Sequence, residues 1–276
     1  MIPLERKRTT EIIPSKFRNP YKKRKDKELM IAHRAFLNNP GKKIVFKSSF
    51  WKTAKTQLKK ESNNKCAYCE ANTALVAHGD VEHYRPKDTY WWLAYTYDNF
   101  LYACQICNQS YKSDNFPIES NQYPPPPITV NTTDQEINQL VGNISPDPID
   151  ITLNYGLQRY IDEHRLEMAL LLNPYFDDPT AYFAYEADDT IEEVRIIPSK
   201  PEYFKYVEAA EKYYGINRIE LKNARYSIYR IFRILKTVYP ILPDIPEKNE
   251  IKNRIHDMLS DRQVFAGMTR YFDNKI

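Results

Sequence analysis

Glycine is scarce in this sequence, and long apolar runs are missing. Only 6 of the 276 residues are Gly, against 19 Pro and 22 Tyr. This balance disfavours a glycine-rich α/β nucleotide-binding fold and favours helices joined by proline-containing loops. No apolar run approaches the roughly 20 residues that cross a bilayer. The basic N-terminus is not followed by the apolar stretch of a secretory signal. We therefore expect a cytoplasmic protein that does not bind a membrane.

The net charge of +4 hides an uneven distribution of charge. Residues 1–60 contain 18 Lys and Arg against 4 Asp and Glu, a balance of 18 − 4 = +14. The remaining residues contain 22 basic and 32 acidic side chains, a balance of 22 − 32 = −10. A basic segment of this strength can neutralise nucleic-acid phosphates. It could equally contact an acidic partner protein, and charge alone does not separate the two.

Three segments divide the chain, and together they predict an α-rich (α+β) fold. Residues 1–47 form a basic N-terminal arm, whose first 28 residues are expected to be flexible or ordered by a partner. A short helix is expected within it at residues 27–38. Apolar residues at helical spacing predict another helix over 48–62, at the start of the segment 48–120 that carries the motifs described below.

The segment 121–276 is predicted to be mainly helical and to bind a partner. Its proline-rich start, residues 121–131, excludes a regular helix or a central strand. Alternating polarity around an acidic turn predicts a small hairpin over 182–198. Helices are expected at 156–172, at 201–239 with a break near Gly215, and as one helix or a pair at 247–274.

All four cysteines fall into two Cys-x-x-Cys pairs, Cys66 with Cys69 and Cys104 with Cys107. Two thiolates on one tight turn can share a zinc ion, and two such turns complete a tetrahedral Cys₄ site. Disulfides are disfavoured in the cytoplasm. A closed Cys₄ site leaves no coordination position for a substrate, so we predict a structural Zn²⁺.

The residues around these cysteines resemble the HNH (ββα-metal) endonuclease family in its zinc-stapled form. Glu82-His83 lies between the two pairs, Asn99 follows, and Asn108 comes directly after the last cysteine. The resemblance covers about fifty residues and implies a ββα-metal finger embedded in mainly helical flanks. It also implies metal-dependent hydrolysis of phosphodiester bonds.

Roles follow for the four catalytic candidates. A neutral imidazole can take a proton from water near pH 7, so His83 is the predicted general base. The resemblance implies that Asn99 helps to hold this histidine. It also implies that Glu82 and Asn108 bind a catalytic divalent ion, and few protein ligands with several waters suit Mg²⁺ or Mn²⁺. Glu82 departs from the commoner Asp or His, and either asparagine could instead cap a turn.

Phosphate contacts are predicted for Lys112, one helical turn after Asn108, and for Arg85 and Lys87. The neighbouring aromatic residues Tyr84, Trp91 and Trp92 are expected in the local core. The remaining histidines have no motif around them and are expected to be structural; they are His33, His78, His164 and His256.

A narrower resemblance extends from about Trp51 to Arg230. The stretches 65–70, 82–87 and 167–179 together look like the nuclease subunits of Septu-type bacterial anti-phage systems, including those attached to retrons. Such subunits act with an ATPase of the ABC/SMC-like type, so the resemblance implies a hetero-oligomer. The tyrosines of the C-terminal helices would then be interface candidates, or ordinary packing residues.

Three functions remain open at this point. The first is cleavage of DNA as the effector of a defence system. The second is the same chemistry on RNA, such as a tRNA. The third is a zinc-stapled adaptor that binds nucleic acid or protein without catalysis, although such an adaptor would not need Glu82, His83, Asn99 and Asn108 in this order.

Overall fold

The computed structural model describes residues 1–41, 43–73, 79–150 and 155–276, so His78 lies outside the described residues. The described part is an α+β fold that combines helices with two small antiparallel sheets. The α-helices are α1 (Tyr21–Asn38), α2 (Ser48–Trp51), α3 (Lys55–Glu61), α4 (Asp134–Leu140), α5 (Leu157–Arg165), α6 (Pro179–Tyr182), α7 (Phe204–Tyr214), α8 (Ile219–Val238), α9 (Pro246–Leu259) and α10 (Ala266–Asp273).

Shorter helical turns connect these elements. The 3₁₀ turns are η1 (Ser15–Phe17), η2 (Lys52–Ala54), η3 (Trp91–Leu93), η4 (Tyr97–Asn99), η6 (Pro201–Tyr203) and η7 (Tyr239–Ile241). The turn η5 (Ile106–Lys112) is a π-helix. Together α2, η2 and α3 cover the helix expected over 48–62, with a 3₁₀ break in the middle.

Each sheet has two strands. In the first, β1 (Asp80–His83) runs antiparallel to β2 (Phe100–Ala103), and His83 lies opposite Phe100. The second pairs β3 (Phe183–Asp188) with β4 (Glu193–Pro198), which confirms the predicted C-terminal hairpin. The π-helix η5 follows β2 after a short connection, so the order of elements around the motif is strand, strand, helix.

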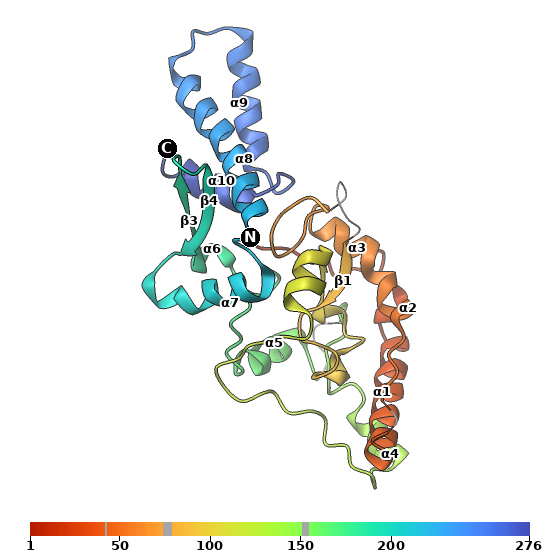
Figure 1. Ribbon diagram of the computed structural model, residues 1–276. Helices are drawn as coiled ribbons and strands as arrows, with labels where there is room; N and C mark the ends of the chain where they lie inside the picture. The colour runs from red at the N-terminus through yellow and green to blue at the C-terminus, as the bar shows by residue number, and fades with distance from the viewer. Residues whose placement is uncertain (42, 74–78, 151–154) are drawn as a thin grey trace.

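Two hydrophobic clusters meet at the β1–β2 hairpin. Leu101 and Ala103 of β2 belong to a cluster with the cysteines, the β3–β4 sheet and the C-terminal helices. Val81, Phe100 and Tyr102 belong to a second cluster with the N-terminal segment and helices α1 to α3. Figure 1 shows β1 between α1–α3 on one side and the β3–β4 sheet on the other. The hairpin is therefore held from both sides.

The first 28 residues pack against the rest of the protein, so the prediction of a flexible arm is wrong. Ile2, Ile13 and Phe17 are buried apolar anchors in this segment. Arg6 is also buried, and its guanidinium donates to the carbonyls of Tyr97 (2.7 Å) and Phe100 (2.9 Å). Composition suggested disorder because it counts charges and does not reveal that a few apolar residues and one arginine meet distant partners.

The C-terminal helices largely follow the sequence pattern. The break near Gly215 is confirmed: this residue has φ +59° and ends α7, and an added Cβ would lie 2.4 Å from the ring of Tyr111. The helix expected over 156–172 ends earlier, at Arg165, because Met168 adopts φ +53° and Ala169 pairs with Ile118 in a β-bridge. Among the described residues, no helix combines the length and apolar character needed to cross a membrane.

Candidate active site and metal centre

The four cysteines come together into one buried cluster. Their Sγ atoms all lie within 4.8 Å of one another. Four thiolates around a zinc ion at about 2.3 Å would be about 3.8 Å apart, so the cluster fits such an ion after a small contraction. Hydrogen bonding from Cys107 lowers the pKa of Cys104, whereas burial raises the pKa of Cys66. The donor set therefore suits a thiolate-binding metal such as zinc.

Arg218 adds a positive charge to the cysteine cluster, a role that the sequence did not reveal. Its Nη1 lies 3.5 Å from Sγ of Cys107. A zinc ion bound by four thiolates carries a net negative charge, which a neighbouring guanidinium offsets. Arg218 lies more than one hundred residues after Cys107, and no local pattern connects the two.

His83 occupies the end of β1, where its imidazole is held on three sides. Nε2 lies 3.0 Å from the carbonyl oxygen of Ala94, and the ring forms T-shaped pairs with Trp51 and Phe100 at centroid distances of 4.9 Å and 5.0 Å. Burial lowers the pKa of His83 to about 3, with a smaller contribution from Lys87. The ring is therefore neutral at pH 7. Because a carbonyl only accepts, Nε2 carries the proton and Nδ1 keeps a free lone pair.

Glu82 is buried beside His83 and forms an ion pair with Lys112. The Lys112 ammonium lies 2.6 Å from Oε1 of Glu82 and donates to the main-chain oxygen of His83 at 3.1 Å. Tyr68 donates to the same carboxylate oxygen at 3.4 Å. Burial raises the pKa of Glu82, and Lys112 opposes this shift. Lys112 is itself fully buried, so the prediction that it contacts phosphate is wrong.

Asn99 and Arg85 hold the turn that follows β1. The Asn99 side chain accepts from the main-chain N–H of Arg85 at 2.8 Å and donates to its carbonyl at 2.9 Å. The carbonyl of Ala94 is thus the acceptor for Nε2–H of His83, and Asn99 instead holds the turn that follows this histidine. The Arg85 guanidinium donates to Glu167 at 2.7 Å in the interior. The predicted phosphate contact of Arg85 is wrong for this reason.

Four of the predicted residues line a single pocket of 310 Å³. They are Glu82, His83, Lys87 and Asn108, and the last two are half-buried. Sequence reasoning missed Trp51 and Asp114 as parts of this wall. Trp51 fitted the apolar stripe of a helix, which gave no signal that its ring faces His83. The complete lining is Trp51, Val81, Glu82, His83, Pro86, Lys87, Asn108, Gln109, Ser113 and Asp114.

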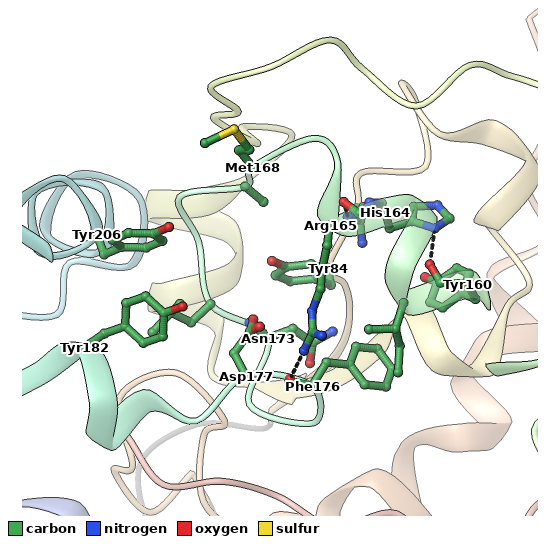
Figure 2. A pocket seen from close by; sticks show the side chains of 14 residues that line it. Tyr84, Tyr160, His164, Arg165, Met168, Asn173, Phe176, Asp177, Tyr182 and Tyr206 are labelled. Carbon is green, nitrogen blue, oxygen red and sulfur yellow. Dashed lines mark hydrogen bonds between the residues drawn. The ribbon is translucent and has the colours of Figure 1, made fainter. Parts of the chain in front are cut away.

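A second hollow, of 220 Å³, is lined by Tyr84, which directly follows β1, and mainly by residues between Tyr160 and Asp177 (Figure 2). Tyr84 lies between Tyr182 and Tyr206 on one side and Tyr160 on the other in this view. Its hydroxyl donates to the main-chain oxygen of Leu171. Through this contact, the stretch 167–179 supports the residue that directly follows β1, the strand that carries His83.

Comparison with known proteins gives two curated relatives, while no family model matches. A protein of Bacillus mycoides (strain KBAB4), described as Septu protein PtuB, is 28% identical over 199 residues, which cover 67% of this chain and 54% of the relative. The chain is similar to Septu protein PtuB. A second PtuB, from Bacillus thuringiensis, is 44% identical over 55 residues, 20% of this chain and 21% of that protein.

The likeness to PtuB confirms the Septu-type resemblance expected from the sequence motifs. It is partial in extent: the chain spans about half the length of the Bacillus mycoides PtuB and about a fifth of the Bacillus thuringiensis PtuB.

Proposed function

We propose that this chain is a metal-dependent HNH endonuclease and the effector subunit of a bacterial anti-phage defence system. One observation carries the proposal: Glu82, His83 and Asn108 line one pocket on a β1–β2–η5 unit that adjoins the four-cysteine cluster. The strand, strand, helix order of this unit supports the proposal of a ββα-metal finger. The likeness to PtuB supports the defence role.

His83 acts as the general base in this proposal. Its Nδ1 takes a proton from a water molecule that attacks the phosphodiester, while Ala94 holds Nε2–H. The low pKa keeps the ring neutral at pH 7 and so ready to accept a proton. It also makes the imidazole a weak base, so a bound metal ion that acidifies the water would assist the transfer.

Glu82 and Asn108 would hold a divalent ion in the same pocket. Carboxylate and amide oxygens are donors that Mg²⁺ and Mn²⁺ accept. Oε1 of Glu82 is engaged by Lys112 and Tyr68, so Oε2 is the oxygen that remains for the ion. When bound, the ion would stabilise negative charge on the phosphate and the leaving oxygen. Lys112 meanwhile opposes the rise in pKa that burial imposes on Glu82.

Nucleic acid is the proposed substrate, with DNA as the first candidate and RNA such as tRNA as the second. Lys87 is the phosphate-contact candidate that remains at the pocket. Trp51 of the pocket wall lies in α2, directly before the exposed Lys52, and Lys55 and the exposed Lys60 follow in α3. These cations would attract the phosphate backbone without regard to base sequence.

An ABC/SMC-like ATPase is the proposed partner, and the α8–α9 projection is its proposed contact surface. These two helices extend away from the rest of the molecule (Figure 1). They carry the exposed isoleucines Ile231, Ile234 and, at their junction, Ile241. Exposed apolar side chains that lie close together mark interaction surfaces. The C-terminal tyrosines Tyr214, Tyr226 and Tyr229 are buried and serve packing instead.

The test is a cleavage assay of the zinc-loaded protein, with and without a purified ABC/SMC-like ATPase of a Septu-type system. Plasmid DNA, single-stranded DNA and total tRNA are each incubated with Mg²⁺, Mn²⁺ or EDTA. We expect cutting that requires the divalent ion. If no substrate is cut under any of these conditions while the ATPase is bound, the catalytic proposal fails, and a zinc-stapled adaptor describes the protein better.

A further inference from the structure

A hollow of 450 Å³ with aromatic walls lies close to the candidate nuclease pocket. Its aromatic side chains come from α1, from the segment before α2 and from η3, which are distant in the sequence. Two charged side chains of opposite sign border it. The lining consists of His33, Phe36, Lys43, Ile44, Phe46, Asp88 and Trp91.

Three of the rings of this hollow, those of His33, Phe36 and Trp91, are packed together. His33 and Trp91 lie almost parallel, with ring centroids 4.1 Å apart and planes 13° apart. Phe36 packs beside His33 at 6.0 Å. The rings of Phe36 and Phe46 are only half-buried, so they keep surface available for a flat ligand. A preformed set of rings binds such a ligand without first paying the entropy of ordering its walls.

Two consecutive residues connect this hollow to the nuclease pocket. Lys87 lines the nuclease pocket and the next residue, Asp88, lines the aromatic hollow. The Lys87 ammonium lies 3.7 Å from Oδ1 of Asp88 and 6.0 Å from the ring centroid of Phe46. A nucleic acid whose phosphate lies beside Lys87 would therefore bring a neighbouring nucleotide to the aromatic rings.

We propose that the aromatic hollow receives an unpaired nucleobase of the substrate, next to the phosphate that is cut. This inference rests on the proposed nuclease function. Aromatic side chains stack on the faces of bases in single-stranded nucleic acids. The carboxylate of Asp88 can accept N–H groups on the edge of a base, and the exposed Lys43 can meet a phosphate. Stacking and pairing inside a duplex cover both faces and the Watson–Crick edge of a base, so the hollow selects single strands and loops.

Binding of labelled oligonucleotides to the full chain, zinc-loaded and carrying His83→Ala to prevent cleavage, tests this proposal by fluorescence anisotropy. The probes are a 12-nucleotide single strand, the same strand with one abasic position moved along it, and the duplex, each as DNA and as RNA. Phe46→Leu removes a stacking ring, whereas Phe46→Trp retains one. Phe204→Leu, an exposed phenylalanine of α7, is the matched control.

We expect Phe46→Leu to weaken single-strand binding about tenfold, while Phe46→Trp and Phe204→Leu leave it unchanged. In the protein that retains Phe46, a strand with one abasic position at the hollow should bind more weakly by the same factor. Phe46→Leu should not weaken the binding of this abasic strand any further. The stronger of the DNA and RNA arms identifies the source of the base. Equal binding of Phe46→Leu and Phe46→Trp, or equal binding of duplex and single strand, would overturn the proposal.

Cleavage is measured separately in the His83 protein, so the two proposals can fail independently. Base-dependent binding without any metal-dependent cutting would contradict the nuclease proposal and leave the hollow as a base site. Cutting that does not change in Phe46→Leu, together with unchanged binding, would remove the base site and leave the nuclease.

Discussion

The ammonium of Lys112 and the carboxylate of Glu82 lie 2.6 Å apart, and both are buried. Removing one member of such a pair leaves the other charge in the interior without a partner. We expect Lys112→Met to lower the free energy of unfolding by about 3–5 kcal/mol. The double variant Glu82→Gln/Lys112→Met should recover most of this loss. Denaturant unfolding of the zinc-loaded proteins measures both.

The exposed cross-strand pair Arg195–Glu186 is the control for this experiment. Arg195→Met should cost only about 0–1 kcal/mol, because water solvates the remaining carboxylate. A cost for Lys112→Met that is no greater than for Arg195→Met would contradict the buried ion pair.

His83→Ala should lower the cleavage rate at least about 100-fold, because it removes the proposed general base. The fold and the zinc content should stay as they are, since the imidazole lies at the edge of a pocket outside the cysteine cluster. Single-turnover cleavage, circular dichroism and metal analysis measure the three quantities. His256→Ala, an exposed histidine of α9, is the matched control. A cleavage rate that survives in His83→Ala would disprove the mechanism even if the protein is a nuclease.

Cys66→Ser should remove the bound zinc and lower the melting temperature. A structural zinc site contributes folding free energy directly, so we expect a fall of about 10 °C or more. Ser110→Ala, an exposed neighbour on the same π-helix as Cys107, should change neither quantity. Metal analysis should find about one zinc per chain before the substitution. A Cys66→Ser protein that keeps its zinc would rule out the four-thiolate site.

Acid should destabilise the protein partly through His164. Burial, with a smaller contribution from Arg85, lowers the pKa of this histidine to about 3. An unfolded histidine titrates near 6.5, so between these values the unfolded state binds more protons. The stabilising contribution is complete above about pH 6.5 and is lost as the pH falls toward 3.

The corresponding variant is His164→Gln. It should flatten the dependence of unfolding free energy on pH within that window by up to about 1.4 kcal/mol per pH unit. Denaturant titrations at pH 4, 5, 6 and 7 measure the slope. An unchanged slope in His164→Gln would show that this histidine does not have the lowered pKa that its burial implies.

Ile234→Glu and Ile241→Glu should abolish association with the ATPase partner. These side chains are 51% and 77% exposed on the α8–α9 projection, so the substitutions should leave folding intact. Co-purification of the two subunits and the melting temperature of the isolated chain provide the readouts. Ile191→Glu, equally exposed on the β3–β4 turn, is the control. Association that tolerates both substitutions on the projection would place the contact elsewhere.

The parts of the site that the sequence predicted are those fixed by short spacing. The two Cys-x-x-Cys pairs and the position of Asn108 beside Cys107 depend on a few consecutive residues, and His83 follows from its motif. The α2–α3 helix and the β3–β4 hairpin follow from periodicity, which is also local.

The position of the Lys112 side chain could not be predicted from local spacing. Its spacing from Asn108 suggested a shared face of an α-helix, but η5 is a π-helix in which Ser113 donates to the carbonyl of Asn108. Such i→i+5 turns are wider and rotate each later side chain. Lys112 therefore faces Glu82 in the interior. The interior contacts of Arg85, Arg6 and Arg218 could not be predicted for another reason. Their partners lie tens of residues away in the sequence or more.

The two aromatic contacts of Arg6 can form only one after the other during synthesis. Its guanidinium lies between the rings of Tyr97 and Tyr175, 4.5 Å and 4.0 Å from their centroids. A ribosome adds roughly 5–20 residues per second, so several seconds separate the emergence of Tyr97 from that of Tyr175. During this interval the segment that carries Arg6 lacks one of its two aromatic partners. Although the hairpin residues are made early, the support beneath the candidate active site is finished only when the second half of the chain arrives.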